Sequence, residues 1–179
     1  MHNQNPETLI DWFDSFSEDN EYDFLSNFYE GEPFRYNGHR FFTAEQAFAY
    51  MKVDPFHAHA QHYRWSILTA HDPGEAKSLG RNCPLVEDWD TNKFGIMREI
   101  VYAKFIQSPR LANKLLDTGQ AWLQEGTYWN DRIWGVDITA SENPFMRPGW
   151  NMLGSILMET RGKILAGQTL VEERDDCAY

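Results

Sequence analysis

The chain has 179 residues, 42% of them hydrophobic, which fits one globular domain with a buried core. A net charge of −11 disfavours a broad, non-specific nucleic-acid surface, although an extruded base can still enter a small basic pocket. We find no signal-peptide pattern, no membrane-length apolar stretch and only two cysteines, so we expect a cytoplasmic protein that contacts no membrane.

The N-terminal third of the chain combines strand and turn signals. Residues 1–21 mix aromatic and acidic side chains, and we expect a loosely attached arm or a short amphipathic helix there. The aromatic segment 24–29 has the composition of a strand. Residues 33–42 predict a β-hairpin, because Asn37-Gly38 tolerates the positive φ angles of a tight turn.

Helices follow, each with its own start signal. Thr43 and Gln46 have capping-box spacing, and Asp72-Pro73 predicts a helix start, with Gly80 expected at that helix's end. The remaining patterns predict helices over 91–107 and 108–119, short strands over 121–127 and 133–138, a final helix from about Asn151, and a frayed tail over 166–179. We therefore predict an α+β fold: a single compact domain with several helices around a small mixed β-sheet.

The helix after Thr43 carries an unusual pair of charges. At about 100° per residue, Glu45 and Lys52 lie on one flank, two turns or roughly 10 Å apart. We expect the small side chain of Ala49 between them to leave a gap for a ligand. Spacing alone favours two solvated flank residues that border the core.

Other polar positions each have a structural alternative. Gly135 fits either a ligand contact or a turn, and Asn151 fits a helix cap. Arg81 fits either phosphate binding or a contact with the end of its helix. His57, His59 and His62 do not complete a recognised metal-ligand spacing, so we predict no metal site.

Collinear motifs resemble one protein family, the NADAR family, over residues 22–165. They are "FLSNFY", "FFTAEQAFAYMK", "DPGEAKSLGR", "DWD", "LLDTG", "IWGVD" and "GWNMLGSILMETR". One departure is visible, since many relatives have His at the position of Gln46. The resemblance implies an N-glycosidase domain between the N-terminal arm and the C-terminal tail.

The resemblance also implies a reaction, the hydrolysis of an N-glycosidic bond to a ribose phosphate unit without a cofactor. Two substrate classes are associated with such proteins: ADP-ribose on the amino group of guanine in nucleic acid, and phosphoribosylamino-pyrimidine intermediates of riboflavin synthesis. The first would reverse a toxin-like modification, as an antitoxin does. We favour it because the sequence departs at Gln46 from the riboflavin-type pattern.

Residue roles follow from the resemblance combined with the chemistry. Glu45 is the expected catalytic carboxylate and Lys52 the expected amine, acting either through a transient Schiff base or as a charge. Asp131 is the expected second carboxylate. The expected substrate-binding residues are Asn27, Arg81, Trp134, Gly135 and Asn151. A module that binds ADP-ribose or NAD without catalysis is the alternative from another class. In a weaker third alternative, the acidic arm binds a partner protein or mimics nucleic acid.

Overall fold

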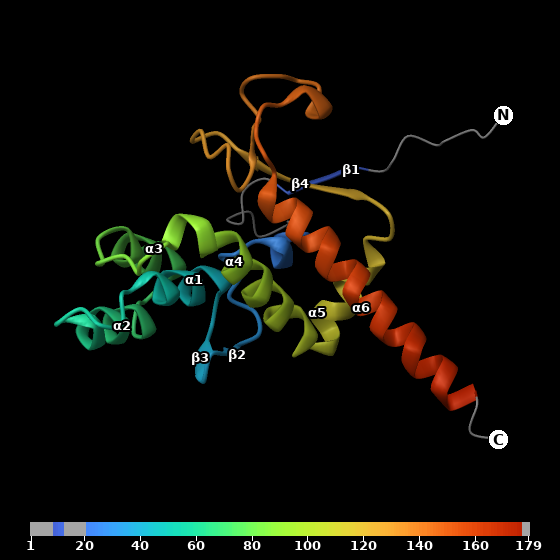
Figure 1. Cartoon of the computed structure of the whole chain (residues 1–179). Coiled ribbons are helices and arrows are strands. Elements are labelled where there is room, and N and C mark those ends of the chain that lie inside the picture. The colour runs from blue at the N-terminus through green and yellow to red at the C-terminus, as the bar shows by residue number, and fades with distance from the viewer. Residues whose placement is uncertain (1–8, 13–20, 177–179) are drawn as a thin grey trace. The chain divides into compact units, whose positions relative to one another are not determined.

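The computed structural model of the protein describes residues 9–12 and 21–176 (Figure 1). The chain divides into two compact units, and we describe each by itself. The helical unit comprises residues Ser26–Ser108, and the sheet unit comprises Met1–Leu25 together with Pro109–Tyr179. Among the described residues, no helix has the length and apolar character needed to cross a membrane.

The helical unit opens with the predicted hairpin. Strand β2 (Phe34–Tyr36) pairs antiparallel with β3 (His39–Phe41), with Phe34 opposite Phe41. Asn37 and Gly38 have φ angles of 46° and 80°, so both central turn residues are left-handed as the sequence predicted. The turn leaves the rings of Phe34 and Phe41 buried on one face.

Four helices complete this unit: α1 (Ala44–Lys52), α2 (Ala60–Leu68), α3 (Pro73–Arg81) and α4 (Trp89–Ile106). Helix α1 packs against the other three (Figure 1). It is buried from Ala44 to Tyr50. Because α1 is enclosed on several sides, Glu45 and Ala49 on its flank are buried as well. Met51 is half-buried.

The sheet unit has a three-stranded parallel sheet in the order β1-β4-β5, formed by β1 (Leu9–Trp12), β4 (Trp122–Thr127) and β5 (Val136–Asp137). Helix α6 (Met152–Asp176) packs on β4 and on α5 (Pro109–Asp117). Two short 3₁₀ helices, η1 (Asp23–Leu25) and η2 (Pro144–Met146), lie in this unit. The predicted α+β class is confirmed, with the parallel sheet and the hairpin as separate sheets.

The structure corrects some of the local predictions. Segment 24–29 is not a strand, because it begins in η1 and then turns where the Ser26 hydroxyl accepts a hydrogen bond from Phe28 N at 3.0 Å. Helix α6 continues to Asp176, within the segment expected as a frayed tail, and β1 lies within the expected N-terminal arm. The rest of that arm, residues 1–8 and 13–20, lies outside the described residues.

Candidate active site

Helix α1 positions Glu45 and Lys52 from a well-defined start. The Thr43 hydroxyl accepts a hydrogen bond from Gln46 N at 3.0 Å, which is the predicted cap. The Gln46 side-chain oxygen accepts in turn from Phe42 N at 3.0 Å. Glu45 therefore lies in the first turn and Lys52 in the last, where each charge has the sign that the helix dipole favours.

Glu45 is not a solvated flank residue, since only 6% of it is exposed. Its backbone N donates to the carbonyl of Asn27 at 2.9 Å, so the segment before α1 covers the start of the helix. Burial of a carboxylate is costly unless other groups compensate its charge. Lys52 is one such group, because the two side chains interact electrostatically across two helical turns.

The gap expected at Ala49 does not exist. Ala49 is fully buried, and Gly80 of α3 packs directly on it: a Cβ added at Gly80 would lie 2.8 Å from the Ala49 Cβ. Helix α3 also passes through Gly80 and ends at Arg81, so the role predicted for Gly80 as a helix terminator is wrong. The two small residues instead allow α1 and α3 to approach closely.

Lys52 is half-buried beside two aromatic rings. Its Nζ lies 5.1 Å from the ring centroid of Phe48 and 5.8 Å from that of Trp89. The backbone carbonyl of Lys52 accepts from Val86 N at 2.8 Å, which holds the segment that leads to Trp89 against the end of α1. The side chain is therefore held in a partly apolar environment.

This environment changes the protonation of Lys52. Burial lowers the pKa of the Lys52 amine, and the positive charges of Lys77 and Arg81 lower it further. Glu45 and the thiol of Cys83 oppose this change by favouring the charged amine. Burial also raises the pKa of Cys83. Because the net effect lowers the pKa of Lys52, more of its amine is neutral than in a free lysine at the same pH.

Asn27 and Arg81 are the two other predicted site residues of the helical unit. Asn27 contacts Glu45, and Arg81 acts on Lys52. Asn27 is buried, its carbonyl binds Glu45 N, and its side-chain amide donates to the sulfur of Met97 at 3.6 Å. Arg81 is exposed at the end of α3 and acts electrostatically on Lys52. Sequence reasoning missed Lys77 and Cys83, although the spacing of Lys77 and Arg81 along one helix face was a readable signal.

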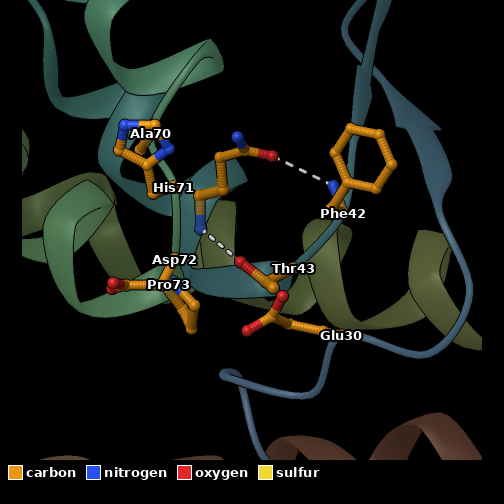
Figure 2. A pocket seen from close by; sticks show the side chains of 8 residues that line it. Glu30, Phe42, Thr43, Ala70, His71, Asp72 and Pro73 are labelled. Carbon is orange, nitrogen blue, oxygen red and sulfur yellow. Dashed lines mark hydrogen bonds between the residues drawn. The ribbon is translucent and has the colours of Figure 1, made fainter.

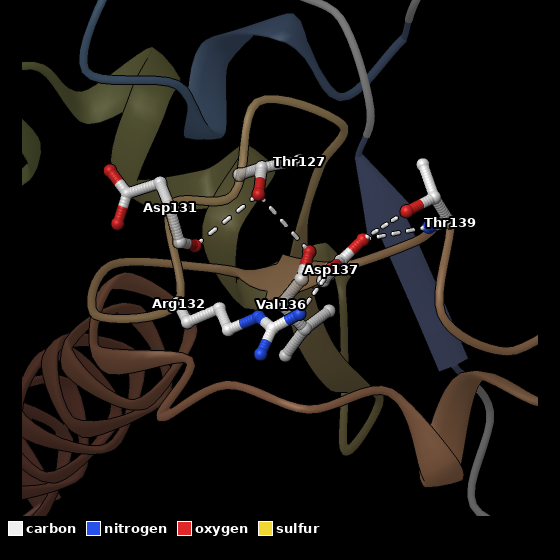
Figure 3. Close-up of polar contacts among 6 residues, drawn as sticks. All are labelled: Thr127, Asp131, Arg132, Val136, Asp137 and Thr139. Atoms are coloured by element: carbon white, nitrogen blue, oxygen red, sulfur yellow. Dashed lines mark hydrogen bonds and ion pairs between the residues drawn. The ribbon is translucent and has the colours of Figure 1, made fainter.

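The other predicted residues belong to the sheet unit. One carboxylate oxygen of Asp131 accepts from the backbone N of Ile133 at 3.2 Å and of Trp134 at 3.0 Å. The carbonyl of Asp131 accepts from the Thr127 hydroxyl, while its carboxylate extends away from the other side chains drawn in Figure 3. Asp131 therefore stabilises the turn that contains Trp134.

Gly135 and Asn151 have structural partners in the same unit. A Cβ at Gly135 would lie 2.5 Å from the carbonyl oxygen of Glu125, so the absence of a side chain lets the backbone approach β4. The Asn151 amide donates to Leu123 O at 2.8 Å and accepts from Glu125 N at 3.0 Å. A side chain at Gly154 would meet the carbonyl of Leu123, so close packing of α6 on β4 explains that glycine.

Asp137 of the sheet unit is held by polar contacts with its neighbours (Figure 3). Its carboxylate accepts from the Thr139 hydroxyl at 2.6 Å and Thr139 N at 3.0 Å, and pairs with Arg132 at 2.8 Å. Hydrogen bonding from Thr139, followed by that from Arg132, lowers the pKa of Asp137 to about 2. With its carboxylate held by these neighbours, Asp137 is best explained as a structural anion.

A cavity of about 130 Å³ lies at the N-terminal ends of α1 and α3 (Figure 2). Its lining does not include Glu45 or Lys52; it consists of Glu30, Phe42, Thr43, Gln46, Ala70, His71, Asp72 and Pro73. The side-chain amide of Gln46 donates to the carbonyls of Ile67 and Leu68 at 3.1 and 3.2 Å. This amide thus connects α1 to the end of α2.

Comparisons with known proteins show the family of the chain. The NADAR domain model matches residues 15–165, which span both units. The chain is 32% identical over 160 residues to N-glycosidase YbiA of Shigella flexneri, covering 88% of this chain and 89% of that protein. It is 29% identical to riboflavin biosynthesis protein VVA0006 of Vibrio vulnificus, over 83% of this chain but 37% of that longer protein.

The fold has a solved counterpart. The NMR structure of YbiA from E. coli superposes with a TM-score of 0.72 at 31% identity, covering 92% of this chain and 88% of that one. The family model, the YbiA relative and the solved structure each match most of the chain. The chain therefore belongs to the NADAR family.

Proposed function

We propose that this chain, an N-glycosidase of the NADAR family, removes ADP-ribose from the amino group of guanine in nucleic acid, in the cytoplasm and without a cofactor. The observation that carries the proposal is the pairing of a buried carboxylate, Glu45, with an amine, Lys52, whose pKa is lowered mainly by burial. Hydrolysis of the glycosidic bond of an exocyclic amine can use both groups.

The proposed reaction begins with opening of the ribose ring. Its ring oxygen takes a proton from solvent, and an iminium forms between C1′ and the guanine amino nitrogen. The neutral amine of Lys52 adds to C1′, Glu45 passes a proton from the lysine nitrogen to the guanine nitrogen, and guanine leaves. This step forms a Schiff base between C1′ and Lys52. Water activated by Glu45 then adds to C1′, which releases ADP-ribose and restores the lysine.

The other predicted residues have supporting roles in this proposal. Arg81 is the proposed phosphate ligand, because its exposed guanidinium forms no ion pair with a described residue. Asn27 helps to place Glu45 through its carbonyl. In the sheet unit, we propose Asp131 as the second carboxylate. Trp134, Gly135 and Asn151 are proposed to contact the base or sugar.

Mass spectrometry of a guanine-ADP-ribosylated oligonucleotide tests the function. We expect the wild-type protein to remove the mass of ADP-ribose and Glu45→Gln to leave it in place, with both proteins folded by circular dichroism. Removal at the same rate by Glu45→Gln would contradict the role of Glu45. An intact oligonucleotide with the wild-type protein would contradict the substrate.

Borohydride trapping tests the covalent step separately. Reduction during turnover is expected to attach the ribose-bearing product to Lys52, which mass spectrometry of peptides locates. Lys52→Met, which keeps an unbranched side chain of similar length, is the matched control. An adduct that persists in Lys52→Met, or turnover without any adduct, would contradict the covalent role of Lys52.

A specific observation supports a second substrate, since one relative of this chain is named as a riboflavin biosynthesis protein. Release of ribose 5-phosphate from a phosphoribosylamino-pyrimidine, with no release of ADP-ribose from guanine, would favour that alternative. Calorimetry that shows tight binding of ADP-ribose without turnover of either substrate would instead favour the non-catalytic binding module.

A further inference from the structure

Three cations lie close together in the helical unit of a chain whose net charge is −11. Lys77 and Arg81 are four residues apart on α3, so they share one face of the helix, about 6 Å apart along its axis. Both act electrostatically on Lys52 of α1. None of the three forms an ion pair with a residue that the structure describes.

Helix packing explains why these cations lie together. Gly80 contacts Ala49, and a Cβ at Gly80 would also lie 3.6 Å from Cδ of Lys52. The last turn of α3, which carries Arg81, is thereby fixed beside the last turn of α1. One turn earlier, Nζ of Lys77 lies 5.1 Å from the ring centroid of Phe28. The ring holds the ammonium group in place without neutralising it.

The charges around Lys52 are unbalanced. The charged groups that act on it are Glu45 from its own helix and Lys77 and Arg81 from α3, together with the thiol of Cys83 after α3. Lys52 thus has two cations and a single carboxylate among the charged residues that act on it. Like charges held together in a folded protein repel one another, so an arrangement of this kind suits an anionic ligand.

We propose that Lys77 and Arg81 together bind a diphosphate, so that this face of α3 selects a diphosphate-bearing ligand over a monophosphate. The planar guanidinium of Arg81 can bind one phosphoryl group through two hydrogen bonds, and the ammonium of Lys77 acts on the next as a point charge. As an account of the substrate, this inference rests on the proposed function, because ADP-ribose carries a diphosphate and a phosphoribosyl group does not.

Calorimetry with inorganic pyrophosphate and inorganic phosphate, at one ionic strength, tests the site without turnover. We expect the wild-type protein to prefer pyrophosphate and Lys77→Met to weaken pyrophosphate binding about tenfold or more, while phosphate binding changes less. Lys77→Arg should largely restore the preference, because it retains the charge. Lys163→Met on α6, which removes an exposed lysine paired with Glu159, is the control for net charge.

The outcomes separate this inference from the proposed function. Equal binding of pyrophosphate and phosphate by the wild-type protein would overturn it, even if ADP-ribose is released from guanine. So would an unchanged preference in Lys77→Met. A preference that Lys77→Met abolishes and Lys77→Arg restores would support the diphosphate site, even if no ADP-ribose is released. Equal loss in Lys77→Met and Lys77→Arg, with reduced thermal stability in both, would assign Lys77 a structural role and overturn the inference.

Discussion

Gly80 of α3 lies directly on Ala49 of α1, and a Cβ at position 80 would lie 2.8 Å from Cβ and 3.1 Å from Cα of Ala49. Ala49 lies between Glu45 and Lys52 on α1, so the contact with Gly80 lies between the two residues of the candidate catalytic pair. It also sets where Lys77 and Arg81 lie relative to Lys52. A single close approach of two helices therefore determines the electrostatic environment of the amine.

Replacement of this glycine tests that relationship. Gly80→Ala is expected to lower the free energy of unfolding by about 1–3 kcal/mol, because the backbone of α1 cannot give way as a flexible side chain would. The matched control is Gly95→Ala in α4, where an added Cβ meets nothing within 4 Å and the residue is exposed. That change should stabilise the protein by about 0.4–1 kcal/mol. Urea unfolding measures both, and equal effects would contradict the packing argument.

The pKa of Lys52 should shift in opposite directions when an acidic neighbour and when a basic neighbour is replaced. Glu45→Gln removes a charge that raises the pKa of Lys52, so it should lower that pKa further. Lys77→Met removes a like charge, so it should raise the pKa. Competitive labelling with acetic anhydride across a pH series, followed by peptide mass spectrometry, measures the pKa of this one amine.

Lys163 is the internal reference in the same labelling experiment. Lys163 is exposed and pairs with Glu159 on α6, so its reactivity should be the same in both variants. If catalysis uses the neutral amine of Lys52, the rate should rise with pH through the lowered pKa. A shift of the Lys52 pKa in the same direction in both variants would refute the electrostatic account.

Asn151 offers a test of structural against substrate-binding roles. Asn151→Asp replaces the amide that donates to Leu123 O with an oxygen that faces the same carbonyl. Since the residue is buried, we expect a loss of about 1–3 kcal/mol in the free energy of unfolding. Asn143→Asp is the control, because its side-chain oxygen only accepts from Phe145 N and is exposed. An Asn151→Asp variant of full stability and altered substrate affinity would favour the substrate-binding role alone.

Asp137 should make the sheet unit sensitive to acid. Its folded-state pKa of about 2 lies below the ordinary carboxyl value of about 3.9, so its contribution is complete above that ordinary value. The contribution is lost as the pH falls toward 2. Asp137→Asn should therefore lower the midpoint of thermal unfolding at pH 7, with a difference from wild type that shrinks below about pH 4.

Circular dichroism melts between pH 2 and pH 7 measure this dependence. Thr139→Val should reproduce part of the effect, because hydrogen bonding from Thr139 is the main reason for the low pKa. Asp90→Asn is the control, since the carboxylate of Asp90 is exposed and its pair with Lys93 on α4 is a surface salt bridge. A constant difference between wild type and Asp137→Asn at every pH would exclude titration of Asp137 as the cause.

Local signals in the sequence predicted the parts of the fold that depend on neighbouring residues. The turn at Asn37-Gly38, the cap at Thr43 and the start of α3 at Asp72-Pro73 each follow from the conformational preference or hydrogen bonding of two or three side chains. Segment 24–29 was misread because strand composition does not reveal a competing bond such as that of the Ser26 hydroxyl.

The same distinction between local and tertiary features applies to the candidate site. The sequence by itself determined that one short helix carries Glu45 and Lys52, because helical periodicity is local. Only the tertiary structure decided that Ala49 is covered by Gly80, that Glu45 is buried, and that Lys77 and Cys83 act on Lys52. Burial and electrostatic environment depend on residues brought together from separate elements, and no local pattern encodes the distances between them.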